Sequence, residues 1–255
     1  MQATPPTTAT EAAAALLLRA RLSGEPLPAL PEALLPADAD AAYAIQQAVG
    51  RQLGAVGGWK VGAKGPTLQP TCAPVLANSI GTSPGTIASH ACRLRGVEAE
   101  IAVRLLRDLP PRDRPYAEDD LAAAIGPAMP ALEVVDSRFA SMARQPALAL
   151  LADGLSNAGL VLGAAGGVLP ADAARQQAEI FFDRQRVAGG AGGNPAGNLL
   201  RLLAWLANHA ARWAGGLREG QVVTTGSWTG LLFAARGTHV RALLGGLGAV
   251  ELSFA

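Results

Sequence analysis

Cysteine is scarce in this sequence, and long apolar runs are absent. The two cysteines among 255 residues, Cys72 and Cys92, form no CxxC motif. A thiolate zinc site and a disulfide framework are therefore not expected. The N-terminus lacks the basic segment of a signal peptide, and no stretch of about 18 apolar residues is free of breaks and charges. We therefore expect a cytoplasmic protein without a membrane span.

Charge is also sparse. Charged residues make up 16% of the chain, the formal net charge is +1, and the arginines form no basic run. These values give no electrostatic basis for binding nucleic acid or an anionic membrane. Lysine is the rarest of the charged residues. Lys60 and Lys64, both in the stretch GGWKVGAKG, are the only lysines among 21 basic residues. A chain that otherwise uses arginine thus places both lysines in one short segment, which calls for an explanation.

Hydrophobic residues, glycine and proline dominate instead. Half of the residues are hydrophobic, which is enough for a sizeable core. Helical spacing predicts two helices before residue 54 and further helices near 117–126 and 197–215. Short apolar segments between Gly/Pro turns predict strands at 58–63, 96–106, 131–138, 159–163, 178–187, 221–228, 239–245 and 249–254.

This order of elements predicts an α+β fold that is rich in β-structure and carries N-terminal helices. We divide the chain into a tail and helical segment at 1–56 and a β-rich domain at 57–255. The two parts are expected to form one structural unit.

Three glutamates stand on predicted strands. Glu98 and Glu100 share one strand face because side chains alternate, and apolar residues occupy the other face. Two neighbouring carboxylates repel each other unless a cation neutralises them, and oxygen ligands suit Mg²⁺, Mn²⁺ or Ca²⁺. Glu133 lies inside the apolar run ALEVV, where an unpaired carboxylate is costly to bury. Together the three could form a metal site, although each could also lie on a solvated strand face.

Six motifs, in order along almost the whole chain, resemble one family. It comprises the 2-hydroxypenta-2,4-dienoate (2-keto-4-pentenoate) hydratases and 4-oxalocrotonate decarboxylases of the fumarylacetoacetate hydrolase superfamily. The motifs that carry the resemblance are AAYAIQ (41–46), GWKVG (58–62), EAEIAV (98–103), PALEVVDSR (130–138), LADGLSNAG (151–159) and TGSW (225–228).

The resemblance implies a mixed β-sandwich or roll in which residues 57–255 form the catalytic domain. It implies that Glu98, Glu100 and Glu133 bind Mg²⁺ or Mn²⁺, which would hold a small 2-oxo or 2-hydroxy carboxylate substrate. Lys60 would act beside the metal and the substrate carboxylate, as a donor or in proton transfer. Members form homo-oligomers, so we expect a homo-oligomer here. Association with a pathway partner enzyme is a further expectation.

The activity that the resemblance implies is a metal-dependent hydratase of aromatic compound catabolism. It would add water to a 2-hydroxy-2,4-dienoate and give a 4-hydroxy-2-oxo acid. The alternatives are a 4-oxalocrotonate-type decarboxylase, an acylpyruvate hydrolase and a non-catalytic 2-oxo acid binding or partner subunit. The substrate-side residues expected from these motifs are Ser227, Thr225, Trp59, Asp153 and Asn157.

Each of these side chains also has a structural interpretation. Trp59 could fill the core, Ser227 and Thr225 could belong to an ordinary turn, and capping could explain Asp153 and Asn157. Lys64 follows Gly62, which should end the strand, so we do not expect Lys64 to be catalytic.

Two departures from the family pattern limit the inference about the reaction. The segment QPTCAPVLANS (69–79) lacks the aspartate of the family's P-D-F-G-like element, and Thr71 or Cys72 stands near its place. Gly154 replaces a usual asparagine in LADGLSNAG. The metal platform is therefore expected, whereas the group that activates water is not identified.

Overall fold

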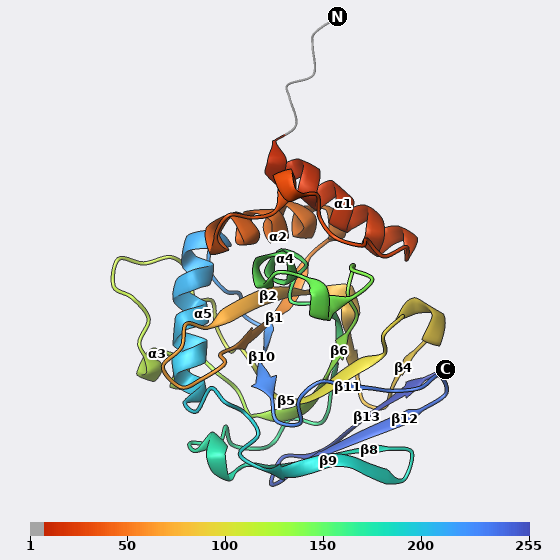
Figure 1. Cartoon of the computed structure of the whole chain (residues 1–255). Helices are drawn as coiled ribbons and strands as arrows, with labels where there is room; N and C mark the ends of the chain where they lie inside the picture. Colours follow the sequence, from red (N-terminus) through yellow and green to blue (C-terminus); the bar gives the residue numbers. More distant parts are fainter. Residues whose placement is uncertain (1–7) are drawn as a thin grey trace, which may run out of the picture.

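Two β-sheets and the helices around them make up residues 8–255, the part that the computed structural model describes. In Figure 1, helices α1 and α2 lie at one end of the molecule, and the smaller sheet lies at the other. The helices are α1 (Ala9–Ser23), α2 (Ala39–Leu53), α3 (Glu118–Ala122), α4 (Ala147–Ala152) and α5 (Leu199–Trp213).

The larger sheet has the strand order β2-β1-β10-β5-β6-β7-β3, with the short β11 paired to β5. Its strands are β1 (Val56–Gly62), β2 (Thr71–Leu76), β3 (Ile80–Thr82), β5 (Gly96–Arg104), β6 (Met129–Val135), β7 (Asn157–Leu162), β10 (Val222–Ser227) and β11 (Leu232–Phe233). The smaller sheet has the order β4-β13-β12-β8-β9. Its strands are β4 (Gly85–Ile87), β8 (Gln177–Phe182), β9 (Gln185–Ala191), β12 (His239–Leu244) and β13 (Gly248–Phe254).

Strand β5 is central to the larger sheet, and its alternation fixes the two faces. Val97, Ile101 and Val103 are fully buried in the core, as the pattern of apolar residues predicts. Strand β5 contacts β8 and β12 of the smaller sheet, and β6 contacts β12 and β13. The apolar side chains between the two sheets belong to one continuous core.

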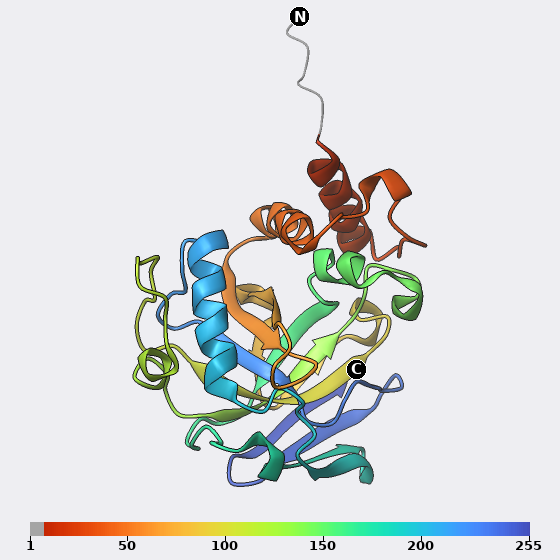
Figure 2. The same cartoon turned by 60° about the vertical axis from the view of Figure 1, so that its left-hand side comes forward.

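The helices cover the remaining surfaces of the larger sheet. Helix α5 packs on β1 and β10, while α2 packs on α1, α4 and β2. Figure 2 shows α5 running alongside the sheet and the N-terminal helices at its end. Leu17 of α1 and Ile45 of α2 are buried in the same core as the strands. The α+β prediction with N-terminal helices is confirmed, whereas the boundary at residue 56 stays a prediction, and residues 1–7 of the predicted tail lie outside the described part.

One strand prediction needs correction, and β2 forms where no strand is predicted. The segment 178–187 is not one strand but the hairpin β8–β9, which turns at Asp183 with a left-handed φ of 55°. The segment 71–76, where no strand is predicted, forms β2. Its Pro74 is tolerated because β2 is an edge strand, where a missing N–H leaves no ladder bond unmade. None of the helices within residues 8–255 has the length and apolarity needed to cross a membrane.

Candidate metal centre and substrate cavity

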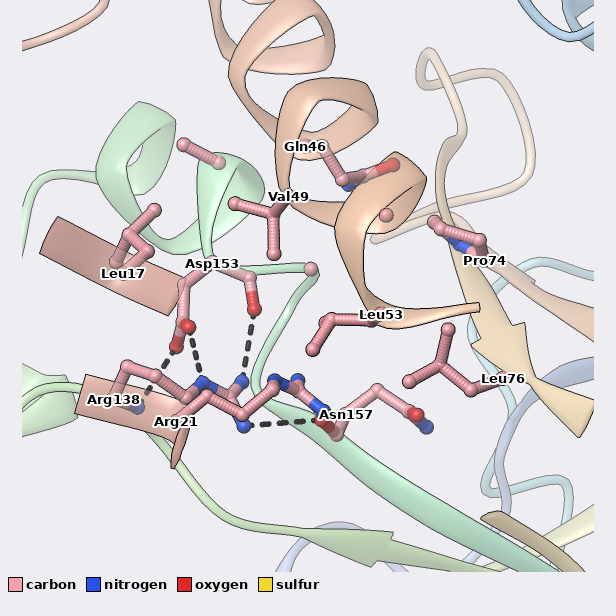
Figure 3. A pocket seen from close by; sticks show the side chains of 13 residues that line it. Leu17, Arg21, Gln46, Val49, Leu53, Pro74, Leu76, Arg138, Asp153 and Asn157 are labelled. Carbon is pink, nitrogen blue, oxygen red and sulfur yellow. Dashed lines mark hydrogen bonds and ion pairs between the residues drawn. The ribbon is translucent and has the colours of Figure 1, made fainter. Parts of the chain in front are cut away.

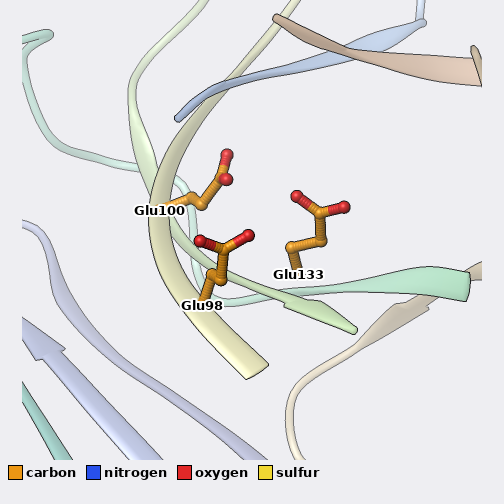
Figure 4. Close-up of side chains that lie close together, drawn as sticks. All are labelled: Glu98, Glu100 and Glu133. Carbon is orange, nitrogen blue, oxygen red and sulfur yellow. The ribbon is translucent and has the colours of Figure 1, made fainter. Parts of the chain in front are cut away.

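Three glutamates converge on one face of the larger sheet. Glu98 and Glu100 project from β5, and the β5–β6 register sets Glu133 directly opposite Glu98. One carboxylate oxygen from each residue lies within 4.8 Å of the others. Figure 4 shows the three side chains pointing toward one another. Because Glu100 is 2% exposed and Glu133 is fully buried, water cannot neutralise this cluster effectively.

The two oxygens of Glu133 differ in their partners. Its Oε1 accepts hydrogen bonds from Lys60 Nζ at 2.5 Å and from Asn157 Nδ2 at 2.9 Å. Its Oε2 is buried and has no hydrogen-bond partner within residues 8–255. A buried carboxylate oxygen without a partner is costly, and a bound cation would remove that cost.

The pKa values of the other two glutamates indicate the same need for positive charge. The pKa of Glu100 is raised well above its usual value by burial and by the charges of Glu133 and Glu98. The pKa of Glu98 is raised by burial and by Glu133, with partial relief from Lys60. One lysine thus fails to balance three carboxylates. The oxygen-only donor set and the unpartnered Glu133 oxygen fit Mg²⁺, Mn²⁺ or Ca²⁺.

Lys60 is the cation of this centre. It lies on β1, two strands away from β5 in the sheet, and it also donates to the carbonyl of Leu155 at 3.3 Å. Burial lowers its pKa, but the charges of Glu133, Glu100 and Glu98 outweigh burial and leave the pKa raised. Lys60 is therefore a protonated donor beside the carboxylates in the metal-free protein.

The turn before β7 brings Leu155 and Asn157 to the centre. Gly154, Leu155 and Ser156 all have left-handed φ values, of 69°, 53° and 58°. Such a conformation costs energy at the two non-glycine residues. The turn directs the Leu155 carbonyl at Lys60 and the Asn157 amide at Glu133.

Two arginines donate hydrogen bonds to the end of this turn. The Asn157 carbonyl accepts from Arg21 Nη2 of α1 at 2.9 Å and from Arg138 Nη1 at 3.1 Å. Arg138 also forms a buried ion pair with Asp153. Together with residues of α1, α2 and α4, these side chains line a small cavity of about 40 Å³. Figure 3 shows how they lie. Helix α1, through Arg21, is thereby connected to a residue that orients Glu133.

A cavity of about 610 Å³ opens in front of the glutamates. Lys60, Glu98, Glu100 and Ser227 contribute to its lining, as expected for site residues. Lys64 and Thr71 also line it. The rest of the lining is Val61, Gly62, Ala63, Leu68, Gln69, Leu155, Gly193, Asn194, Pro195, Gly226 and Gly230. Sequence reasoning missed Lys64 as a cavity residue, although the scarcity of lysine was a signal for it.

Three side chains that were expected to contact the substrate make other contacts in the structure. Trp59 points to the face of β1 opposite to Lys60, where its Nε1 donates to Gln221 Oε1 at 3.2 Å. The fully buried Thr225 hydroxyl donates to the Ile101 carbonyl at 2.9 Å.

Asp153 is the third of these residues: it forms an ion pair with Arg138 and accepts a hydrogen bond from the Ser137 hydroxyl. The lining of the cavity includes none of the three side chains. Asn157 reaches the centre only through Glu133.

The structure separates the two residues that stand near the place of the missing aspartate. Thr71, at the start of β2, lines the cavity, whereas Cys72 is fully buried on the other face. Burial raises the pKa of Cys72 to about 12, so its thiol is not a base. Within residues 8–255, Glu98 and Glu100 are the only carboxylates of the lining.

Comparison with solved structures shows which known proteins share this fold. The chain superposes over its full length on 4-oxalocrotonate decarboxylase from Pseudomonas putida G7 in complex with magnesium and adipate (TM-score 0.86, 21% identity, 100% of each chain). It also matches 2-hydroxyhepta-2,4-diene-1,7-dioate isomerase from Mycobacterium marinum (TM-score 0.56, 14% identity, 78% of this chain and 75% of that chain). The chain therefore has the fold of these two enzymes.

Sequence comparison narrows the class to a family. No family model matches the chain. The 2-keto-4-pentenoate hydratase of Paraburkholderia phymatum is 35% identical over 260 residues, which cover 96% of this chain and 97% of the relative. 2-keto-4-pentenoate hydratase 2 of Dechloromonas aromatica is 31% identical over 97% of this chain and 98% of the relative. The chain belongs to the 2-keto-4-pentenoate hydratase family.

Proposed function

We propose that this protein is a metal-dependent hydro-lyase of aromatic compound catabolism. It adds water to a 2-hydroxy-2,4-dienoate, the enol form of a 2-oxo-4-enoate, and forms a 4-hydroxy-2-oxo acid. One observation carries the proposal: Glu133 clusters with Glu98 and Glu100 and pairs with Lys60, and the last three side chains line a single cavity. The full-length similarity to 2-keto-4-pentenoate hydratases supports it.

Each group of the centre has a distinct role in this proposal. Glu98, Glu100 and Glu133 would hold Mg²⁺ or Mn²⁺, which when bound supplies a Lewis acid for the 2-oxygen of the substrate. The Lys60 ammonium faces the same cavity, where it can donate to the substrate carboxylate or supply a proton. Ser227, also in the lining, offers a hydroxyl to the substrate. Asn157 acts indirectly because its amide fixes the orientation of Glu133.

A second candidate is a 4-oxalocrotonate-type decarboxylase. The observation that favours it is the absence, within residues 8–255, of any carboxylate in the cavity lining besides Glu98 and Glu100. Hydration needs a group that activates water, and Thr71, which stands near the place of the acidic candidate, offers the cavity only a hydroxyl. Loss of CO₂ needs the same electron sink at the 2-oxygen but no such base.

An ultraviolet assay with 2-hydroxypenta-2,4-dienoate and Mg²⁺ tests the proposal. Metal-dependent loss of the dienol absorbance with formation of 4-hydroxy-2-oxopentanoate is the expected result. Release of CO₂ from 4-oxalocrotonate without hydration of the pentadienoate would refute the hydratase proposal and support the decarboxylase. Failure to turn over either compound, with 2-oxo acids still bound, would indicate a binding role.

The glutamate centre is tested by Glu98→Gln. This variant should weaken Mg²⁺ binding and abolish turnover, because it removes one anionic ligand. Glu25→Gln, a matched change at an exposed position, should leave both unchanged. Unaltered Mg²⁺ affinity of Glu98→Gln would refute the three-glutamate site.

We also propose that the protein forms a homo-oligomer. Light scattering of the full chain measures its mass directly.

A further inference from the structure

Lys64 lines the cavity, but the proposed function gives it no role. It is exposed on the segment that follows β1, and it lines the same cavity as Lys60. Within residues 8–255 its ammonium has no ion pair in the structure, whereas Lys60 is paired with Glu133. Nineteen of the 21 basic residues are arginine, yet both lysines face this one cavity. The placement points to a ligand group that an ammonium binds.

The segment that carries Lys64 is held in place by α5. Arg201 of this helix donates to the carbonyl of Gly65 at 3.4 Å and to the carbonyl of Leu68 at 3.3 Å. Pro66 packs closely on Gly197, where an added Cβ would lie 3.3 Å from the proline ring. Lys64 therefore projects from a fixed backbone, and ordering it around a ligand costs mainly the freedom of its own side chain.

The cavity is electrostatically asymmetric. Its acidic lining residues, Glu98 and Glu100, belong to the metal centre, where Lys60 also lies. Within residues 8–255 the remaining lining is neutral apart from Lys64. Lys64 lies four positions after Lys60, so their Cα atoms are at most about 14 Å apart. An extended ligand that starts at the metal centre can thus reach the second ammonium.

The size of the cavity supports a longer ligand than a five-carbon acid. Its volume of about 610 Å³ lies in the range of roughly 300–1,000 Å³ that is typical of pockets for drug-sized ligands. A substrate that ends at the metal centre would leave the Lys64 side of this volume to solvent.

We propose that Lys64 binds a second carboxylate, at the end of the substrate remote from the metal centre. The preferred substrates are then 2-hydroxydienoates and 2-oxo acids that carry a distal carboxylate, rather than monocarboxylates. This inference rests on the proposed function for one point, that the first carboxylate lies at the metal centre. A single flexible ammonium suits the task because it follows the distal group without the fixed fork of a guanidinium.

Binding of matched, unreactive probes tests the inference. 2-Oxoadipate and 2-oxohexanoate have the same chain length and differ only in the distal carboxylate. Calorimetric titration of the Mg²⁺-loaded protein should show a preference for 2-oxoadipate of about tenfold, the size of one charge-assisted hydrogen bond. Lys64→Met should reduce this preference to within twofold through weaker 2-oxoadipate binding, while 2-oxohexanoate affinity is retained. Lys64→Arg should keep most of the preference.

Arg184→Met is the control for net charge. Arg184 is exposed at the β8–β9 turn and does not line the cavity, so its loss should leave the preference intact. The preference should also decline with added salt because the distal pair is partly exposed. Equal affinity of the native protein for the two probes, or an unchanged preference in Lys64→Met, would overturn the inference.

Turnover separates failure of this inference from failure of the proposed function. The kinetic pair is 2-hydroxyhexa-2,4-dienedioate and 2-hydroxypenta-2,4-dienoate. If neither is turned over but Lys64 governs the 2-oxoadipate preference, the hydratase proposal fails and the inference stands. If the pentadienoate is hydrated and Lys64→Met leaves the discrimination between the two dienoates and between the two probes unchanged, the inference fails and the hydratase proposal stands.

Discussion

Replacing Glu100 with glutamine removes one charge from the metal centre with little change in shape. Glu100 is 2% exposed, and its Oε2 accepts the Gly226 N–H at 3.0 Å. The amide oxygen of glutamine can accept the same hydrogen bond, so Glu100→Gln isolates the effect of the charge. We expect the metal-free variant to be more stable than the native protein and to respond less to Mg²⁺.

The magnitude follows from the geometry of the cluster. The carboxylate oxygens lie within 4.8 Å of one another, where two unit charges repel by about 3.5 kcal/mol at an effective dielectric constant of about 20. Attraction to Lys60 and partial protonation offset much of this repulsion, so we expect a net gain of about 1–3 kcal/mol. For a chain of this size that gain raises Tm by roughly 2–12 °C.

The gain should depend on pH in a defined direction. The pKa of Glu100 is raised in the folded protein by burial and by its acidic neighbours. The folded protein therefore holds a proton more tightly than the unfolded chain, and native stability falls as pH rises through the raised pKa. The advantage of Glu100→Gln should be large at pH 8 and should shrink below about pH 4.3, the ordinary pKa of glutamate.

Thermal unfolding followed by circular dichroism measures these effects with EDTA and with Mg²⁺. Mg²⁺ at 100 times its Kd should stabilise the native protein by about 2.7 kcal/mol. The variant should lose most of that increment, and Glu25→Gln should behave like the native protein. A variant that is no more stable than the native protein in EDTA at pH 8, or that gains as much from Mg²⁺, would refute the reasoning.

Three further substitutions test individual contacts. Asn157→Ala should weaken Mg²⁺ binding by about tenfold or more, because it removes the amide that orients Glu133; calorimetry measures this, and an unchanged Kd would contradict it. Lys60→Arg should lower turnover by at least about tenfold, whereas full turnover would show that only its charge matters. Thr225→Val should cost about 1 kcal/mol of stability with turnover retained, since its hydroxyl bonds to Ile101; lost turnover at unchanged stability would make it a substrate contact.

Local patterns in the sequence predicted the two faces of β5. Alternation along β5 sets Glu98 and Glu100 on one face and Ile101 in the core, because a strand has a period of two residues. The same rule would have excluded Trp59, which cannot share a face with its neighbour Lys60. The same rule predicts that Thr225 and Ser227 share a face of their strand. This prediction fails, because Ser227 lines the cavity and Thr225 does not.

The reason for that failure is an irregularity in β10. The register between β10 and β5 shifts between Thr224 and Ser227, and Gly226 has a left-handed φ of 92°. The shift breaks the alternation, so Ser227 faces the cavity while the Thr225 hydroxyl bonds within the sheet. A bulge of this kind depends on pairing between strands far apart in the chain.

By itself, the sequence determined the residue types of the centre, the face of β5 that carries two of them, and the family. Tertiary structure decided which residues meet. Glu133 lies opposite Glu98 only through the β5–β6 register, and Lys60 reaches it only because β1, β10 and β5 are neighbours. The fold also places Lys64 in the lining of the cavity, although β1 ends at Gly62. Contacts between distant strands depend on how the whole core packs, and no local period of the sequence encodes them.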